Sequence, residues 1–174
     1  MDIFLTAHLK PVADFLSTYR TGDATKVDAE GRGLLLMALQ NQDLASRYEI
    51  ADFLLDHDAP VNTSGTNGAT VLHVLFGQVS HDLVRAENLA RRLIDRGANI
   101  NATDLDGRLP FVDILAMKYT DDQLQPIYDL WFAQPDPDFT TASRFGLSPL
   151  TAAKKLPYRS AILARMEGHL RDHA

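Results

Sequence analysis

Six histidines and several acidic pairs are the residues in this 174-residue sequence whose types and spacing suit acid–base chemistry or metal binding. His169 and His173 are four residues apart, so a helix would place both imidazoles on one face. A zinc site built on such a pair needs further protein ligands, and the chain contains no cysteine. We therefore expect no metal at this pair.

Two other segments look at first like ligand loops. Asp104-Leu105-Asp106-Gly107 resembles the start of a calcium loop, but Ala102 stands where the loop needs an oxygen ligand. Ser64–Gly68 is rich in glycine but follows no strand pattern, so it does not predict a phosphate-binding loop. Both are interpreted as turns, and Asp121-Asp122 as the start of a helix. The sequence predicts no catalytic residue, no metal and no cofactor.

The elements that would position these residues are repeated along the chain. Gly31, Gly68, Gly107 and Gly146 occupy the same place in four similar segments, at separations of 37, 39 and 39 residues. A nearly constant separation of this size is typical of stacked supersecondary units. The similar segments are 28–38, 65–75, 104–114 and 143–153.

Each unit predicts a turn followed by two helices. The glycine permits a positive φ in a tight turn, and a small residue or proline then opens a short helix. A second apolar pattern with helical spacing predicts a longer helix in every unit. No segment shows the sustained alternation of a strand, so the predicted fold class is all-α. The residues of the second pattern are Ile50, Phe53, Leu54 and Leu55; Leu89, Leu93 and Ile94; Leu124, Ile127, Leu130 and Trp131; and Ile162, Leu163 and Met166.

These units resemble the ankyrin repeat, whose signature places Thr-Pro-Leu-His after the turn. Thr70-Val71-Leu72-His73 matches three of the four positions, and Ser148-Pro149-Leu150-Thr151 is a close relative. Gly97-Ala98-Asn99-Ile100-Asn101 is similar to the family's Gly-Ala-Asp-Val-Asn junction. The resemblance covers about residues 22–166, and it implies that His73 braces its turn. The units depart from the family in being longer than its repeat of about 33 residues.

The resemblance implies one domain over residues 1–174: an ankyrin-repeat solenoid of about four helix-turn-helix repeats with capping helices at both ends. We expect an N-terminal cap at 1–27 and repeats at 28–64, 65–103, 104–142 and 143–174, the last also acting as the C-terminal cap. The extra residues of each unit should lie between its helices or lengthen them. The loops between units are expected to be anchored by the apolar residues Val61, Ile100 and Phe139.

Composition limits the class of partner and the compartment. Hydrophobic residues make up 45% and charged residues 23%, so the chain can fold without disulfides. The N-terminus lacks a secretion signal and the longest apolar run, 34–39, is too short for a bilayer, so we expect a cytoplasmic protein that binds no membrane. The net charge of −6 disfavours nucleic acid and suits a basic protein partner, unless it only maintains solubility.

The resemblance implies a protein-binding module, a monomer when free, that uses its turn tips and the concave face of its first helices. Apolar residues on a charged rim in the last two units are typical of an interface, although neighbouring turns could instead bury them. A bacterial immunity or inhibitor protein for a basic toxin is the sharper form of this hypothesis. The expected contact residues are Glu30, Arg32, Asn67, Gln78, Leu105, Asp106, Arg108, Met117, Arg144, Phe145 and Leu147.

Two other functions stay open at this stage. An enzyme or enzyme accessory would use the enlarged segments between helices, with His81, Asp82, Asp121 and Asp122 as candidate acid–base groups. A purely structural scaffold would self-associate. The sequence contains no H-E-x-x-H and no G-x-S-x-G motif, so we predict a binding module and not an enzyme.

Overall fold

The chain folds entirely into helices and loops. The structure, a computed structural model, describes residues 2–174; Met1, where the predicted N-terminal cap begins, lies outside them. Within the described range there are two isolated β-bridges but no strand, and the predicted all-α class is confirmed. The helices are α1 (Ile3–Leu9), α2 (Val12–Thr18), α3 (Leu34–Leu39), α4 (Leu44–Asp56), α5 (Val71–Phe76), α6 (Leu83–Asp95), α7 (Pro110–Ala116), α8 (Asp121–Phe132), α9 (Pro149–Lys155) and α10 (Ser160–Asp172), with short 3-10 helices at Asp23–Thr25 and Pro157–Arg159.

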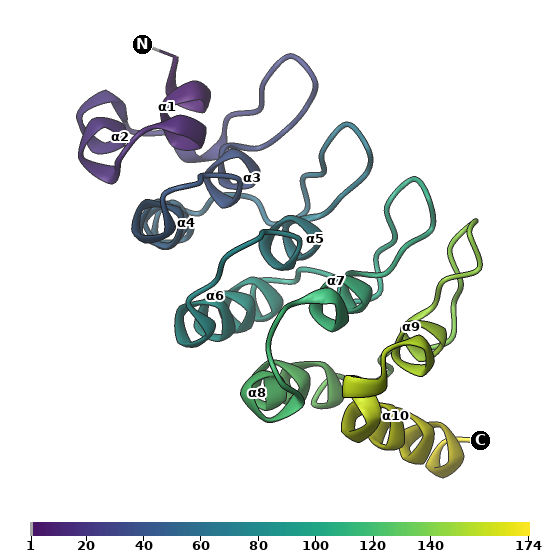
Figure 1. Ribbon diagram of the computed structural model, residues 1–174. Coiled ribbons are helices and arrows are strands. Elements are labelled where there is room, and N and C mark those ends of the chain that lie inside the picture. The colour runs from purple at the N-terminus through teal and green to yellow at the C-terminus, as the bar shows by residue number, and fades with distance from the viewer. Residues whose placement is uncertain (1) are drawn as a thin grey trace.

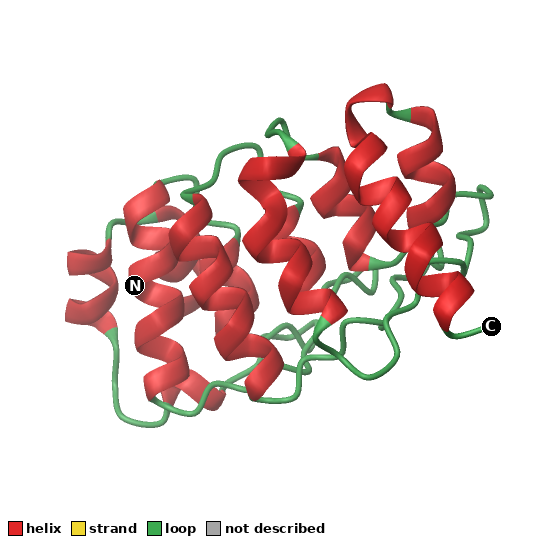
Figure 2. Ribbon diagram, turned by 90° about the horizontal axis from the view of Figure 1, so that it is seen from below, coloured by secondary structure: helices red, strands yellow, loops and turns green. Residues whose placement is uncertain are grey.

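The helices form two rows (Figure 1). The odd-numbered helices α1 to α9 make a first row of short helices, and the even-numbered helices α2 to α10 make a second row. Each helix contacts the next helix of its own row, so consecutive helix pairs lie side by side. Long turns project from the first row, and Figure 2 shows them gathered along one edge of the molecule.

Local sequence signals explain where these helices begin. Pro110 and Pro149 occupy the first position of α7 and α9, where the missing N–H costs no hydrogen bond. Asp43 and Asp82 cap α4 and α6 by accepting backbone N–H groups. Thr120 caps α8, which places Asp121-Asp122 in its first turn as predicted. No helix of residues 2–174 combines the length and apolarity needed to cross a membrane.

The hydrophobic core lies between the two rows. Every residue of α3 is buried, because α1, α4 and α5 all pack against this helix. Further along the stack, the ring of Phe111 lies 5.7 Å from that of Trp131 and 5.2 Å from that of Phe139. Val61, Ile100 and Phe139 are buried, which confirms that they anchor the loops between units.

Buried arginines join neighbouring pairs where the first-row helices end. Arg159 is fully buried and pairs with Asp121 at 3.1 Å. It also donates to the carbonyl oxygens of Leu115 (2.9 Å), Met117 (2.6 Å) and Tyr119 (2.8 Å). These carbonyls lie at or just beyond the C-terminus of α7, where backbone acceptors have no partner in the helix. The last pair is therefore attached to the third unit through one guanidinium.

Arg47 makes a similar link earlier in the chain. It is 1% exposed and donates to the carbonyl oxygens of Asn41 (2.8 Å) and Ser80 (2.7 Å). The segments between the helices, in which the sequence predicted extra residues, thus carry a set of buried polar contacts from one unit to the next.

Candidate functional site

The four long turns share one hydrogen-bond pattern. In the third turn, the N–H of Asp104 donates to the Arg108 carbonyl (3.1 Å) and the N–H of Gly107 donates to the Asp104 carbonyl (3.0 Å). Oδ1 of Asp104 accepts from the N–H groups of Asp106 and Arg108, each at 2.9 Å. Gly107 has a φ of +77°, which side chains with a Cβ rarely adopt. Asp104 therefore holds its own turn, in agreement with the interpretation of this segment as a turn.

The other turns use the same construction with different side chains. Asp28 and the hydroxyl of Ser143 take the part of Asp104 in the first and fourth turns. The second turn has Gly65 at this place, and Oδ1 of Asn67 accepts the N–H of Ala69 instead (3.2 Å). All four aligned glycines have φ between 74° and 78°, as the sequence predicted.

Backbone hydrogen bonds join three of the turns to one another. The N–H of Leu105 donates to the carbonyl oxygen of Asn67 at 2.9 Å. The N–H of Arg144 donates to the carbonyl oxygen of Asp106 at 2.8 Å. The second, third and fourth turns therefore form one continuous border, which we call the turn edge.

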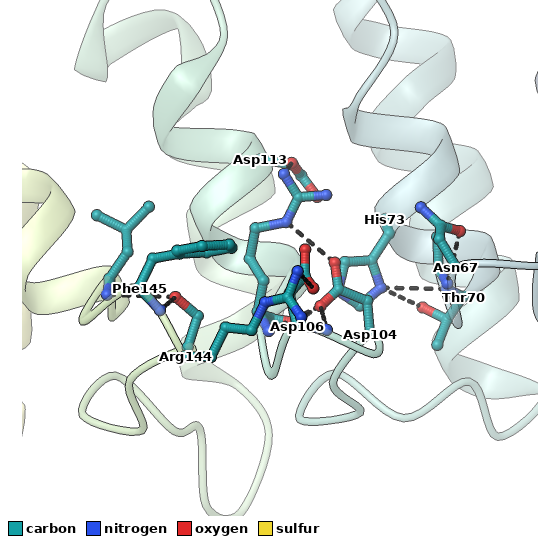
Figure 3. Close-up of polar contacts among 12 residues, drawn as sticks. Asn67, Thr70, His73, Asp104, Asp106, Asp113, Arg144 and Phe145 are labelled. Carbon is teal, nitrogen blue, oxygen red and sulfur yellow. Dashed lines mark hydrogen bonds and ion pairs between the residues drawn. The ribbon is translucent and has the colours of Figure 1, made fainter.

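His73, on the first-row helix α5, holds the turn edge against the first row (Figure 3). Its Nδ1 accepts the N–H of Thr70 (3.2 Å), so Nε2 carries the proton and donates to the Arg108 carbonyl oxygen (2.7 Å). The ring is 2% exposed, and this burial lowers its pKa. A neutral imidazole with both ring nitrogens in hydrogen bonds has a positioning role, as the resemblance to ankyrin repeats implied.

Arg108 lies between two carboxylates behind the turn edge. Its guanidinium is 3.3 Å from Asp104 and 3.2 Å from Asp113. Burial raises the pKa of Asp113 to about 6, although Arg108 opposes the rise. Arg108 is thus held by its own unit and is only partly available to a partner.

Two large apolar side chains project from the turn edge. Leu105 is 74% exposed and Phe145 is 72% exposed, so neighbouring turns do not bury them. Arg144 lies over the Phe145 ring, 4.8 Å from its centroid, and pairs with Asp106 at 2.8 Å (Figure 3). Exposed apolar groups with a charged surround have the composition of an interface core and its rim.

An apolar hollow of about 220 Å³ lies beside this border, between α7 and α9; we call it the α7–α9 pit. Leu147 and Ala152 occupy the positions in the fourth unit that Arg108 and Asp113 occupy in the third. The fourth unit therefore has apolar groups where the third unit has the Arg108–Asp113 ion pair. The small side chain of Ala152 leaves part of this space empty. The walls of the pit are Val112, Ala116, Leu147, Ala152, Lys155 and Leu156.

The other predicted contact residues are placed differently. Glu30 and Arg32 pair with each other at 3.0 Å in the first turn. The amide of Gln78 is half-buried and donates to the Val74 carbonyl, and Met117 is only 5% exposed, so it offers little surface. The structure groups Asn67, Leu105, Asp106, Arg108, Arg144, Phe145 and Leu147 on the joined turns, and leaves Glu30, Arg32, Gln78 and Met117 outside this group.

Three of the four candidate acid–base residues already have structural partners, and the fourth, Asp122, is exposed in the first turn of α8. Asp82 caps α6, and the two oxygens of Asp121 accept from Arg159, Tyr128 and the N–H of Ile162. Burial lowers the pKa of His81, and its Nε2 bonds the Gln78 carbonyl. A hollow of about 410 Å³ in the enlarged segments is lined by none of the four candidates; its walls are Met117, Lys118, Tyr119, Thr120, Gln123 and Tyr158.

Most of the α7–α9 pit was missed by the sequence prediction, which named only Leu147 of its six wall residues. A signal was present in the alignment of units. Ala152 is a small residue at the position where the earlier units have Met37, Val74 and Asp113. A small side chain at a position otherwise filled by larger ones indicates a hollow.

The fold and this surface define a stacked-helix repeat protein with an exposed turn edge. No family model matches the chain. It is similar to Rabankyrin-5 from Homo sapiens, at 30% identity over 162 residues, which is 88% of this chain but only 13% of that relative. Its structure is also similar to the crystal structure of a functionally unknown protein from Leptotrichia buccalis C-1013-b. The TM-score is 0.84, over 98% of this chain and 93% of that chain. Because the sequences are only 23% identical, this similarity shows the fold alone.

Proposed function

We propose that this chain is an ankyrin-repeat solenoid that binds another protein through its turn edge and the adjoining face of the first-row helices. The observation that carries the proposal is the exposure of Leu105 and Phe145 on turns whose backbones are bonded together. Apolar side chains held on a rigid support lose little conformational freedom on binding, which favours affinity. Phe is among the residues that anchor interfaces, and Arg144 beside it is another.

The regular placement of the turn glycines supports the ankyrin assignment, as does the bracing of a turn by His73. The similarity to a human protein whose name contains ankyrin points the same way. We further propose that the protein is cytoplasmic and is a monomer when free. We also propose that it acts without catalysis, because His81, Asp82 and Asp121 of its candidate acid–base groups serve a helix cap, a buried ion pair and a backbone contact.

The class of partner is a second part of the proposal. A net charge of −6 would speed encounter with a basic protein through long-range attraction. An immunity protein that neutralises a basic toxin fits this description. The turn edge itself carries paired charges, so the proposal that it binds protein does not depend on that class.

Affinity capture with matched variants tests the proposed function. The double variant Leu105→Asp/Phe145→Asp places charges on the turn edge, and Val84→Asp places one on α6, where Val84 is 69% exposed. All three side chains are exposed, so each variant should keep its circular dichroism and melting temperature. Immobilised protein is incubated with extract of the source cells at low salt, and captured proteins are identified by mass spectrometry.

We expect wild type and Val84→Asp to recover the same protein and the double variant to lose it. Equal recovery by all three proteins would place the binding surface elsewhere. Recovery of nothing above the bare resin would argue against a binding module.

A further inference from the structure

We infer that the α7–α9 pit is the anchor point for the partner, and that it receives one bulky apolar side chain from an extended protein segment with a carboxylate beside it. This inference rests on the proposed function and adds the chemistry of the recognised segment. Its basis is the occurrence, at one place on the surface, of an apolar hollow and a lysine that forms no ion pair with any of residues 2–174.

The walls of the pit suit an apolar side chain. Val112 and Ala116 of α7 face Ala152 and Lys155 of α9, with Leu147 from the turn and Leu156 completing the hollow. A space of about 220 Å³ holds a single side chain and is too small for a folded element. Interfaces gain most of their energy where one large group fills such a hollow and displaces water.

Lys155 supplies the charge that selects the neighbouring residue. Its stem forms part of the pit wall while the residue is exposed, so the ammonium group lies at the mouth. The adjacent Lys154 pairs with Glu167 at 3.6 Å, whereas Lys155 forms no ion pair within residues 2–174. A carboxylate on the occupant would pair with it, and a basic group there would be repelled.

The fourth unit differs in charge from the whole chain, although four of its basic side chains are already paired with carboxylates: Arg144, Lys154, Arg159 and Arg165. Residues 143–174 contain six basic side chains and two acidic ones, although the whole chain has a net charge of −6. The partner's overall charge and the charge of the segment it inserts are therefore separate questions. Long-range attraction would favour a basic protein, while the pit would select an acidic segment within it.

The pit also continues into the turn edge. Phe145 and Leu147 are two residues apart in the fourth turn; one is exposed on the edge and the other lines the pit. A segment anchored at Leu147 would pass over Phe145, where Arg144 is already paired with Asp106. The contact of the partner segment with Phe145 would be apolar, so its carboxylate would lie at the end of the segment that is near Lys155.

Selection of short random peptides displayed on phage tests the inference without knowledge of the partner. The bait is the full chain. Ala116→Trp fills the pit from an exposed wall position, and Lys155→Glu reverses the charge at its mouth. The matched controls are Ala161→Trp and Arg171→Glu, which make the same kinds of change at exposed positions of α10.

We expect the enriched peptides to share a Leu, Ile, Met or Phe with an Asp or Glu within two residues. A synthetic peptide of the consensus sequence should lose at least about tenfold in affinity to Ala116→Trp and to Lys155→Glu. It should bind both controls as it binds wild type, measured by fluorescence polarisation. The inference is overturned if no sequence is enriched, if basic residues flank the apolar one, or if Ala116→Trp binds as tightly as wild type.

Failure here can be separated from failure of the proposed function. If the turn-edge variant loses captured protein but the peptides ignore the pit, the chain is a binding module with its anchor elsewhere. If neither experiment detects a ligand, the proposed function fails together with the inference.

Discussion

The Nε2 atom of His73 lies 2.7 Å from the carbonyl oxygen of Arg108, so a side chain of the second unit holds the backbone of the third turn. The same ring bonds the backbone of Thr70 through Nδ1. Both nitrogens are buried and engaged, which makes this imidazole a joint between two units of the turn edge.

Replacing His73 should weaken the whole fold. His73→Ala leaves the part-buried N–H of Thr70 and the Arg108 carbonyl with one partner fewer each, and it opens a cavity. We expect a loss of about 2–4 kcal/mol in the free energy of unfolding, measured by urea denaturation. His173→Ala removes an exposed imidazole near the C-terminus and should change stability by less than about 0.5 kcal/mol. Equal effects of the two substitutions on the free energy of unfolding would show that His73 does not hold the two units together.

The contribution of His73 should depend on pH. Burial lowers its pKa in the folded state below 6.5, so the unfolded chain takes up the proton first. Its stabilising effect is complete above about pH 6.5 and is lost as pH falls through the lowered pKa. The stability gap between wild type and His73→Ala should therefore narrow from pH 7.5 to pH 5. A gap that widens over this range would contradict the assigned protonation state.

Asp113 should have the opposite pH dependence. Its folded pKa is raised from 3.8 to about 6, so the favourable state is the protonated one, and its stabilising effect is lost as pH rises from about 4 through 6. Relative to Asp113→Asn, wild type should lose up to about 3 kcal/mol between pH 4 and pH 8. Paired urea titrations across this range measure the difference, with the exposed Asp122→Asn as control. A flat difference would mean that Asp113 is not desolvated.

Two glycines with the same φ should respond differently to alanine. Gly31 (+78°) has open space around its missing Cβ, whereas a Cβ on Gly68 (+76°) would lie 2.9 Å from the Leu105 nitrogen. Gly31→Ala should cost about 1–2 kcal/mol from backbone strain alone. Gly68→Ala should cost about 1 kcal/mol more, because the third turn must move. Urea midpoints compare them, and similar losses would mean that the turns are not in contact.

Removing Arg159 should detach the last helix pair. Arg159→Met leaves the carbonyl oxygens of α7 and the Asp121 carboxylate without their buried cation, and we expect a loss of about 3–5 kcal/mol. Since each unit is held by its neighbours, unfolding should also become less cooperative, with a smaller dependence on urea concentration. Arg171→Met, at an exposed position, should leave both quantities unchanged.

Much of the fold could be predicted because its signals are local. A glycine is needed wherever a turn requires a positive φ, so Gly31, Gly68, Gly107 and Gly146 mark the turns without knowledge of the rest. Helix starts follow from prolines and capping residues in the same way. Periodic apolar residues then indicate which face of each helix is buried.

The site was predicted less completely because it depends on contacts between units. Met117 was expected to be a contact residue, yet the structure buries it where Arg159 donates to its carbonyl oxygen at the end of α7. The burial of Arg159 itself has no local signal, since an arginine in an apolar helix pattern ordinarily points to solvent. Whether Leu105 and Phe145 are exposed likewise depends on how far neighbouring turns stand apart.

Each helix pair is held chiefly by its contacts with the adjacent helix pairs, and this has a mechanical consequence. A pull applied between the two ends of the chain would act on the junctions in series, so the stack would open one pair at a time from a terminus instead of all at once. The junction between α7 and α9 lies next to the C-terminal end, and it contains both the pit and the Arg159 contact. Tension on that end would separate the walls of the α7–α9 pit early. A partner segment anchored in the pit would then be released while the other helix pairs were still folded.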